Sequence, residues 1–297
     1  MATAFCPAHI TGFFKAELDK KDSKQLGSLG AGFSIQKGVK TTVTIRNKTK
    51  HDISNFTIKV NGFESGNMRV SEVVLSKFST KGKFVDIIHE IDVPVGYGFG
   101  SSAAVALSLS IALNDALGCK LSKIKVAQIA HDVEIECKTG LGDVLASYYG
   151  GFEIRDKPGA PGIGHVQNIT LNKISIIMIC FSPISTSKFI KERLPRINGL
   201  GGKMVNELLK SKNYEHFQEM SLEFAKYVDV MTPRMQKVVN ELSKNNIKCG
   251  IALFGETIFS MIPKENENKI LKILEKYSDG IIIKSELDNT GARVLYN

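Results

Sequence analysis

The sequence contains no tryptophan and no long apolar run, and it has only five cysteines. The cysteines, at positions 6, 119, 137, 180 and 249, form no Cys-x-x-Cys pair and have no histidine doublet nearby. This argues against a zinc site or a disulfide framework and favours a reducing cytosol, with each thiol acting as a small buried hydrophobic group. No apolar segment reaches membrane-spanning length and no signal peptide precedes Met1. We therefore expect a cytoplasmic protein with no membrane partner.

The balance of charge is basic, with a formal net charge of +9 over 297 residues. The lysines are dispersed, however, and no aromatic residues are interleaved with them as in a nucleic-acid-binding surface. Attraction of small polyanions such as ATP therefore explains the charge better than nucleic acid does. With 43% hydrophobic and 23% charged residues, the chain is expected to fold as one large or two medium globular domains.

The most informative stretch is Pro94–Ala104, which reads Pro-Val-Gly-Tyr-Gly-Phe-Gly-Ser-Ser-Ala-Ala. Its glycines permit backbone angles and close approaches that a side chain would forbid. The two serines stand where a helix N-cap would, before a buried helix expected over 103–117. Such a turn presents free N–H groups and a positive dipole end, which predicts a phosphate site. The alternative is a glycine turn that merely begins a helix.

The same stretch is neither a P-loop, because no Gly-Lys-Ser/Thr follows, nor the dinucleotide fingerprint, whose glycine spacing differs. It resembles the second motif of the GHMP kinase superfamily, Pro-x-x-x-Gly-Leu-Gly-Ser-Ser-Ala, with Phe99 where the family usually has leucine. The resemblance implies ATP as a substrate. It also implies an ATP-binding role for Pro94, Gly96, Gly98, Phe99, Gly100, Ser101, Ser102 and Ala103.

The N-terminal segment 3–14 is predicted to be a short strand broken by Pro7, followed by a turn that carries His9, Thr11 and Gly12. This segment is similar to the first motif of archaeal pantoate kinases. The Gly-Ser-x-Gly-Ala-Gly element at 27–32 also resembles their pattern, although glycines so placed could equally mark a flexible hairpin entry. Alternating apolar residues at 39–45 predict a half-buried strand after it.

A second informative stretch covers residues 139–152, where Asp143 follows Gly140-Leu141-Gly142. On its own, Asp143 could be only a helix N-cap. Glu134 precedes it by nine residues, a spacing that resembles the GHMP pattern. The resemblance implies that Ser102 and Glu134 hold Mg²⁺, while Asp143 orients the acceptor alcohol and accepts its proton. Glu136 points about 200° away from Glu134 on a helix and is expected on a solvated face, and His131 is expected on the helix surface or packed, not as a ligand.

A strand is predicted over 150–157, and it carries Arg155 and Lys157. The planar guanidinium of Arg155 suits a substrate carboxylate. Together with His9 and Thr11, these two cations are the candidate substrate-binding residues. Each of the three charged candidates could equally be a surface or packing residue.

In the rest of the chain, the spacing of apolar residues predicts strands and helices in both halves. Strands are expected over 56–60, 84–93, 173–181, 247–254, 257–262 and, as the last one, 280–285. Helices are expected over 68–78, 121–137, 185–227, 232–242 and 270–277. The segment around Gly250 and Gly255 takes the place of the third GHMP motif but is poorer in glycine.

Periodicity alone indicates an α+β protein with two segments. The resemblance implies the two-domain GHMP kinase fold, with the active site between the domains. In that fold, residues 1–170 form a mixed-sheet, ATP-binding N-terminal domain and residues 171–297 a ferredoxin-like C-terminal domain.

The implied reaction is the ATP-dependent phosphorylation of pantoate to 4-phosphopantoate, a step of archaeal coenzyme A biosynthesis, with Mg²⁺. Mevalonate, homoserine or a sugar are the alternative acceptors within the superfamily. A non-catalytic ligand-binding or RNA-binding module is the alternative outside it, but an anion binder gains nothing from added carboxylates such as Glu134 and Asp143. The sequence leaves the oligomeric state open, a homodimer included.

Overall fold

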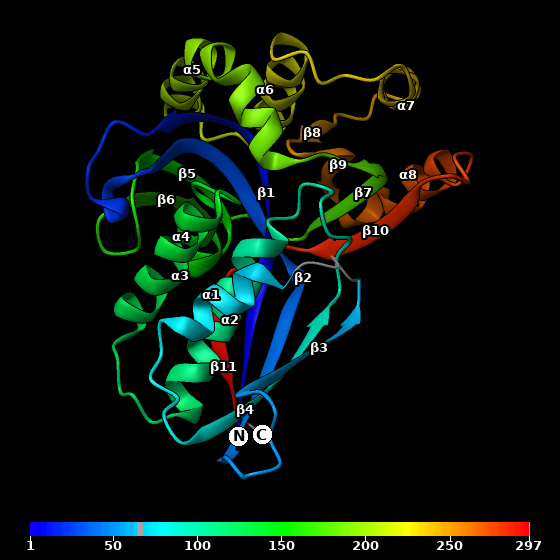
Figure 1. Cartoon of the computed structure of the whole chain (residues 1–297). Coiled ribbons are helices and arrows are strands. Elements are labelled where there is room, and N and C mark those ends of the chain that lie inside the picture. Colours follow the sequence, from blue (N-terminus) through cyan, green and yellow to red (C-terminus); the bar gives the residue numbers. More distant parts are fainter. Residues whose placement is uncertain (64–67, 297) are drawn as a thin grey trace.

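The computed structural model describes residues 1–63 and 68–296 of the chain. It contains two sheets with helices packed around them (Figure 1). The 7-stranded first sheet has the order β11 (Arg293–Leu295), β1 (Ala2–Glu17), β2 (Gly27–Asn47), β4 (Lys83–Ile91) and β3 (Phe56–Gly62), with β5 (Phe152–Lys157) on β2 and β6 (His165–Ile169) on β5. Only β3 and β4 run parallel, so this sheet is mixed.

The second sheet has four antiparallel strands in the order β10 (Ile281–Glu286), β7 (Ile174–Pro183), β9 (Gly255–Pro263) and β8 (Gly250–Ala252). Helices α5 (Thr186–Ser211), α6 (Tyr214–Tyr227) and α7 (Pro233–Lys244) separate its first two strands along the chain, and α8 (Glu267–Leu274) separates its last two. This order is that of a ferredoxin-like unit. The α+β class and the two-domain fold expected from the sequence are confirmed, whereas the boundary between 170 and 171 stays a prediction.

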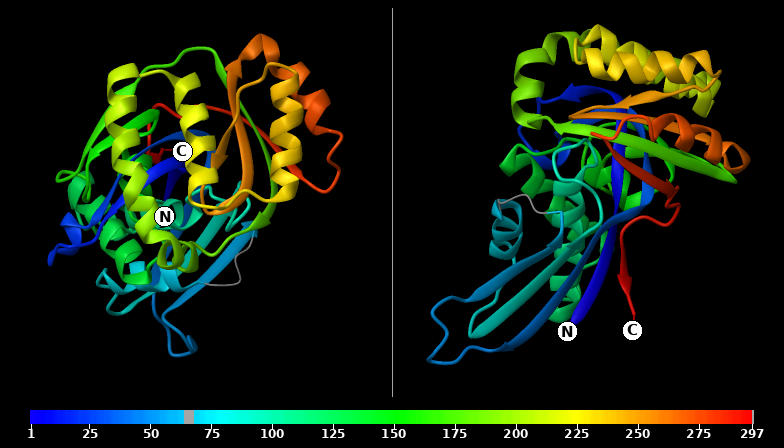
Figure 2. Two further views of the ribbon diagram at one scale, coloured as in Figure 1. Left: turned by 90° about the horizontal axis from the view of Figure 1, so that it is seen from above. Right: turned by 90° about the vertical axis from the view of Figure 1, so that its right-hand side faces the viewer.

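The helices of the N-terminal half are α1 (Arg69–Ser76), α2 (Ser101–Ala116), α3 (Lys123–Cys137) and α4 (Asp143–Tyr149). Helix α2 packs on β1 and β2 and is covered by α1 and α3, so it is apolar all round and buried. Helices α5 and α6 pack against β1 as well, so β1 is covered by helices of both halves (Figure 2). No helix within residues 1–63 and 68–296 is long and apolar enough to cross a membrane.

Strand β1 corrects the expectation of a strand broken at Pro7 with a turn at His9–Gly12. It is continuous over 16 residues, with bulges at Pro7/Ala8 and Thr11/Phe13. Proline is tolerated at a bulge because no ladder hydrogen bond is needed there. Gly38 of β2 permits the pairing, since a Cβ at this position would lie 2.2 Å from the carbonyl oxygen of Cys6. His9 and Thr11 therefore project from a rigid strand.

Glycines 27–32 do not form a flexible hairpin entry either, because they are the first part of β2 and pair with both β1 and β5. Two short strands, β6 and β11, were not predicted, and the strand at 281–286 is not the last one. After β10 the chain returns to the first sheet, where β11 pairs with Thr3–Phe5 of β1. The other predicted strands and helices are confirmed within a few residues of their expected bounds, with the helical stretch 185–227 divided into α5 and α6.

Candidate active site

The loop between β4 and α2 approaches the second sheet so closely that side chains are excluded from it. Gly96 and Gly98 both have φ of 86°, and Gly100 has φ of 56°. A Cβ on Gly98 would lie 2.4 Å from the carbonyl oxygen of Leu253. The glycine spacing seen in the sequence thus corresponds to left-handed backbone and to a backbone-to-backbone contact.

Hydrogen bonds fix the loop from several elements. The backbone N–H of His9 donates to the carbonyl oxygen of Phe99 at 3.0 Å, and that of Ile184 donates to Gly96 at 2.9 Å. The hydroxyl of Thr257 on β9 donates to the carbonyl oxygen of Tyr97 at 2.8 Å. The loop is therefore held in one position by β1, by the end of β7 and by β9.

Helix α2 begins directly after this loop, with Gly100 as its N-cap and no side-chain cap. The N–H of Ala104 donates to the carbonyl oxygen of Gly100, so the N–H groups of Ser101 to Ala103 precede the first helical hydrogen bond. These groups carry the positive end of the helix dipole, which favours an anion.

A cavity of about 410 Å³, the large cavity of this site, lies over the loop and the start of α2. Of the predicted ATP-binding residues, it is lined by Gly96, Gly98, Phe99, Gly100, Ser101 and Ser102. Pro94 and Ala103 are buried and do not line it. Two cations that the sequence analysis missed, Arg69 and Lys138, also line it. Lys138 ends α3 in the left-handed conformation, and no spacing rule indicates that it faces this cavity.

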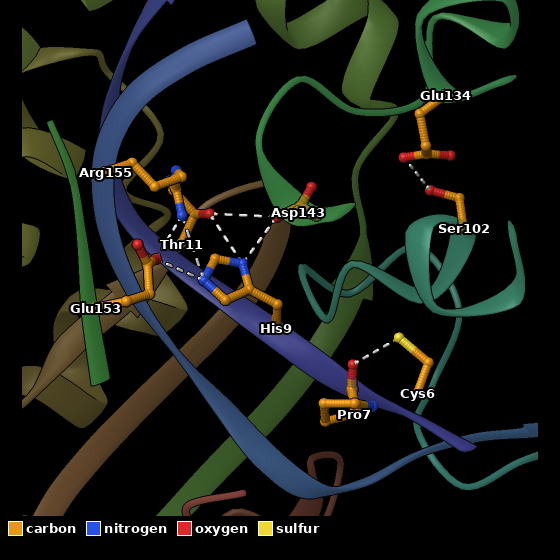
Figure 3. Close-up of polar contacts among 9 residues, drawn as sticks. All are labelled: Cys6, Pro7, His9, Thr11, Ser102, Glu134, Asp143, Glu153 and Arg155. Carbon is orange, nitrogen blue, oxygen red and sulfur yellow. Dashed lines mark hydrogen bonds and ion pairs between the residues drawn. The ribbon is translucent and has the colours of Figure 1, made fainter. Parts of the chain in front are cut away.

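Glu134 lies beside the start of α2, as the resemblance implied (Figure 3). Its Oε2 accepts a hydrogen bond from Ser102 Oγ at 3.2 Å, and its Oε1 accepts one from Thr139 Oγ1 at 2.5 Å. The side chain is 2% exposed, and burial raises its pKa to about 7. The carboxylate of Glu134 and the neighbouring hydroxyl groups together offer oxygen ligands of the kind that hard cations prefer. Glu136, in contrast, pairs with Lys77 on the surface, and His131 is packed with Nε2 3.1 Å from the carbonyl oxygen of Ser23.

Gly140 separates Glu134 from Asp143. A Cβ on Gly140 would lie 2.3 Å from Glu134 Oε2 and 3.2 Å from Asp143 Oδ2. The missing side chain leaves room between the two carboxylates. Among the described residues there is no group of three His, Cys, Asp or Glu side chains that could bind a metal ion by themselves.

Asp143 is the first residue of α4 and lines the large cavity. Its Oδ1 lies 2.8 Å from His9 Nδ1 and 3.4 Å from Thr11 Oγ1. Burial alone would raise the pKa of Asp143, but the hydrogen bond and charge of His9 outweigh it, so the pKa is lowered. Asp143 is therefore ionised at neutral pH and held by two residues of β1.

His9 was predicted to contact a substrate, but in the structure it lies beneath Asp143 and is fully buried. Its Nε2 lies 2.9 Å from Oε1 of Glu153, a residue that the sequence analysis missed. Glu153 also forms an ion pair with Arg155. Glu153 and Arg155 are two residues apart on β5, which places both side chains on the same face of the sheet.

Arg155 and Lys157 have different surroundings because a bulge lies between them. Arg155 is 1% exposed and lines a small hollow of about 10 Å³ beneath Asp143, together with Thr11, Phe14, Ser28, Ile190 and Phe254. Its Nε has no hydrogen-bond partner among the described residues. Lys157 is exposed and lines neither this hollow nor the large cavity.

A second, mostly apolar cavity of about 180 Å³ adjoins the large one and shares Val70, Val95, Ser101, Ser102 and Thr139 with it. Its other lining residues include Val60, Ile91, Val105 and His89. His89 is held by Thr41 and Ser71, and burial lowers its pKa to about 4, so its ring is neutral. No sequence pattern indicates this cavity, because its lining comes from separate strands and helices.

Comparison with known proteins agrees with this geometry. Residues 68–151 match the family model of the GHMP kinases N terminal domain. The chain is 34% identical to a pantoate kinase of Methanocaldococcus jannaschii, over 91% of this chain and 96% of that protein, and 30% identical to a pantoate kinase of Thermococcus kodakarensis, over 91% of each. A solved structure described as a phosphotransferase related to the CoA biosynthesis pathway superposes with a TM-score of 0.87 at 29% identity, covering 98% of this chain and 97% of that one.

The loop geometry predicts that Gly98→Ala weakens ATP binding at least tenfold and destabilises the fold, because the new Cβ meets the backbone of Leu253. Gly82→Ala is the matched control, since Gly82 has φ of 71° but a Cβ added there would have no other atom within 4 Å. It adds only the cost of left-handed alanine, about 1–2 kcal/mol. Calorimetric ATP titration and urea unfolding measure both effects. If both variants bind ATP alike, the close approach at Gly98 is not needed for the site.

Proposed function

Because the chain belongs to the GHMP kinases and is a small-molecule kinase that uses ATP, we propose that it transfers the γ-phosphoryl group of ATP to the primary hydroxyl of pantoate. The product is 4-phosphopantoate, a precursor of coenzyme A. One observation carries the choice of site: Asp143 lies between the large cavity at the glycine loop and a hollow that contains a buried guanidinium. The curated relatives named pantoate kinase support the choice of acceptor.

The triphosphate would lie along the start of α2. The N–H groups of Ser101, Ser102 and Ala103 offer donors to phosphate oxygens, and Arg69 and Lys138 contribute positive charge at the same cavity. The adjoining apolar cavity of about 180 Å³ is suited to the adenine ring. Its walls come from Val60, Ile91 and Val105, and neutral His89 adds no charge to it.

The oxygen donors of Ser102 and Glu134, and the space that Gly140 leaves beside them, fit Mg²⁺. Magnesium accepts few protein ligands and keeps several waters, so a hydroxyl and a carboxylate suffice. When bound, it would neutralise charge on the transferring phosphate oxygens.

The acceptor would lie with its hydroxyl at Asp143 and its carboxylate directed into the hollow beneath. The hollow has room for about one water-sized group, which is enough for one carboxylate oxygen. Its wall includes Ser28, Thr11 and Arg155, whose Nε has no hydrogen-bond partner among the described residues. Phe14, Ile190 and Phe254 form the apolar part of the wall, and Phe254 also lines the large cavity, where the gem-dimethyl group of pantoate would pack against it. Phe13, the neighbour of Phe14 in the chain, is packed instead against Phe217 and Phe224.

The reaction is then a matter of alignment and charge. The hydroxyl oxygen attacks the γ-phosphorus, the bond from that phosphorus to the bridging β–γ oxygen breaks, and ADP leaves. The hydroxyl proton passes to Asp143. Because His9 lowers the pKa of this carboxylate, it is a weak base, so it takes the proton late, when the attacking oxygen is already partly bonded.

The direct test is incubation of the protein with ATP, Mg²⁺ and pantoate, with detection of ADP and 4-phosphopantoate by ³¹P NMR. Asp143→Asn should lower kcat by about 10²–10⁴-fold with little change in the KM for ATP, because it removes a positioned base. Near-normal turnover by this variant would reduce Asp143 to a helix-terminal residue. A wild-type protein that phosphorylates mevalonate or homoserine but not pantoate would refute the proposed acceptor.

For the metal, we expect Ser102→Ala and Glu134→Gln each to raise the Mg²⁺ concentration needed for half-maximal rate at fixed ATP, because each removes an oxygen ligand or its charge. Glu136→Gln is the matched control, since Glu136 lies on the same helix but pairs with Lys77 on the surface. Half-saturation that stays unchanged in both site variants would contradict the proposed metal site.

For the acceptor, Arg155→Met should raise the KM for pantoate at least tenfold and leave the KM for ATP close to normal. A charge-assisted hydrogen bond contributes about 1.5–3 kcal/mol. The variant also removes one of the two cationic partners of Glu153, the other being His9, so kcat is expected to fall. The ratio of the two KM values is therefore the diagnostic quantity. Lys157→Met, two residues along the strand, serves as control. An unaltered pantoate KM in Arg155→Met would place the carboxylate contact elsewhere.

A further inference from the structure

Glu153 is a fully buried carboxylate that no part of the proposed reaction has used so far. It lies on β5, opposite Gly32 of β2, and Figure 3 shows it on the far side of the His9 ring from Asp143. Its Oε1 accepts from His9 Nε2 at 2.9 Å and from Arg155, while Oε2 has no partner among the described residues. One carboxylate oxygen therefore joins the histidine under the proposed base to the cation of the acceptor hollow.

The histidine ring has a carboxylate at each nitrogen. Ionised carboxylates only accept hydrogen bonds, so both ring nitrogens donate and His9 is an imidazolium. The four side chains form a row of alternating charge: negative Asp143, positive His9, negative Glu153 and positive Arg155. The row is neutral as a whole, which is the arrangement that a buried site tolerates.

Glycines make the space for this row. A Cβ on Gly32 would lie 2.5 Å from His9 Nε2, and a Cβ on Gly142 would lie 2.8 Å from Arg155 Nε. The ring and the guanidinium therefore lie against bare backbone, where neither has room to turn away. Glycines 27–32, which the sequence analysis singled out, thus serve the packing of this row as well as the strand.

We propose that Glu153 is a positioning residue for phosphoryl transfer, which keeps His9 a donor on both sides and so holds Asp143 Oδ1 in place with Oδ2 facing the acceptor. This inference rests on the proposed function. The remaining groups around His9 do not replace Glu153. On β1, the strand of His9 itself, the neighbouring polar group is Thr11. On α4 it is Asp143, and on β5 it is Arg155, whose positive charge disfavours a second cation. The neighbours on β2, Gly32 and Ser34, carry no charge.

The direction of the His9 pKa agrees with this role. Burial lowers it, but the hydrogen bonds to Asp143 and Glu153 outweigh burial, and the pKa is raised. The working state has protonated His9, so activity is lost as the pH rises through its pKa, and removal of the Glu153 charge should bring that loss to a lower pH.

The test is the pH profile of kcat/KM for pantoate in Glu153→Gln, which keeps the shape and an acceptor oxygen but removes the charge. We expect the fall on the alkaline side to move at least one pH unit lower than in the wild type, with kcat at pH 8 reduced at least tenfold. Glu153→Asp, which retains the charge, should restore part of the alkaline activity. Asp156→Asn is the matched control, because it removes a carboxylate from the exposed His165 on the neighbouring strand and should leave the profile unchanged.

A second measurement needs no turnover. In a ¹⁵N-histidine NMR titration of the six histidines, the His9 signal is assigned by its absence in His9→Asn. Wild-type His9 should stay protonated at both nitrogens at a pH where an exposed histidine has already lost its proton. In Glu153→Gln it should lose a proton at least one pH unit earlier. A neutral His9 ring in the wild type at pH 7, or identical titration in the two proteins, would overturn the proposal.

The two experiments separate two kinds of failure. If pantoate is not phosphorylated but His9 titrates as expected, the proposed acceptor is wrong and the coupling of His9 to Glu153 stands. If pantoate is phosphorylated and Glu153→Gln loses rate uniformly, with no shift of the alkaline fall, Glu153 has only a structural role. Should Glu153→Gln be unstable, the wild-type titration alone still decides whether His9 is an imidazolium.

Discussion

The site depends on a contact between two stretches of backbone. The glycine loop and the turn between β8 and β9 approach so closely that a Cβ on Gly255 would lie 2.1 Å from the carbonyl group of Tyr97, just as one on Gly98 would meet Leu253. Leu253 in turn donates its N–H to the carbonyl oxygen of Thr11 on β1. The start of α2, the strand that holds His9 and the second sheet are thus placed relative to one another by direct contacts between their backbones. Phosphoryl transfer requires alignment above all, and rigid backbone contacts supply it.

Two carboxylates of the site have opposite electrostatic surroundings. Asp143 is balanced by cations that the fold provides, so its pKa is lowered. The partners of Glu134 among the described residues are the hydroxyl groups of Ser102 and Thr139, and burial raises its pKa. In the proposed mechanism, this difference separates the carboxylate that would align the acceptor from the carboxylate that would bind a metal ion. Such separation of pKa values between neighbouring acids is a common way of dividing chemical roles.

The sequence predicted the parts of the site that are local in the chain. Three glycines at every second position, followed by two serines, indicate a turn and the start of a helix. The nine-residue interval from Glu134 to Asp143 spans one helix end and one turn. What it could not predict comes from pairing between distant segments. The bulges in β1 depend on its partner β2, and the role of Glu153 depends on the register of β5 against β2, which brings it to His9 across 144 positions. Arg155 illustrates the same limit, because its residue type suggested a cation for a ligand, while its burial and its pairing with Glu153 follow only from the sheet.

Strand β11 has a consequence for the order of folding. It pairs with Thr3–Phe5, the start of the strand that later carries His9, and the two lie side by side at one end of the molecule (Figure 2). This pairing joins the segments most distant along the chain, so the entropy of closing the intervening loop must be overcome before the edge of β1 is covered. During synthesis at the ribosome, β1 is made long before β11, so its edge at Thr3–Phe5 stays unpaired until the intervening segments have been made. Until then, that edge can pair with strands of other molecules.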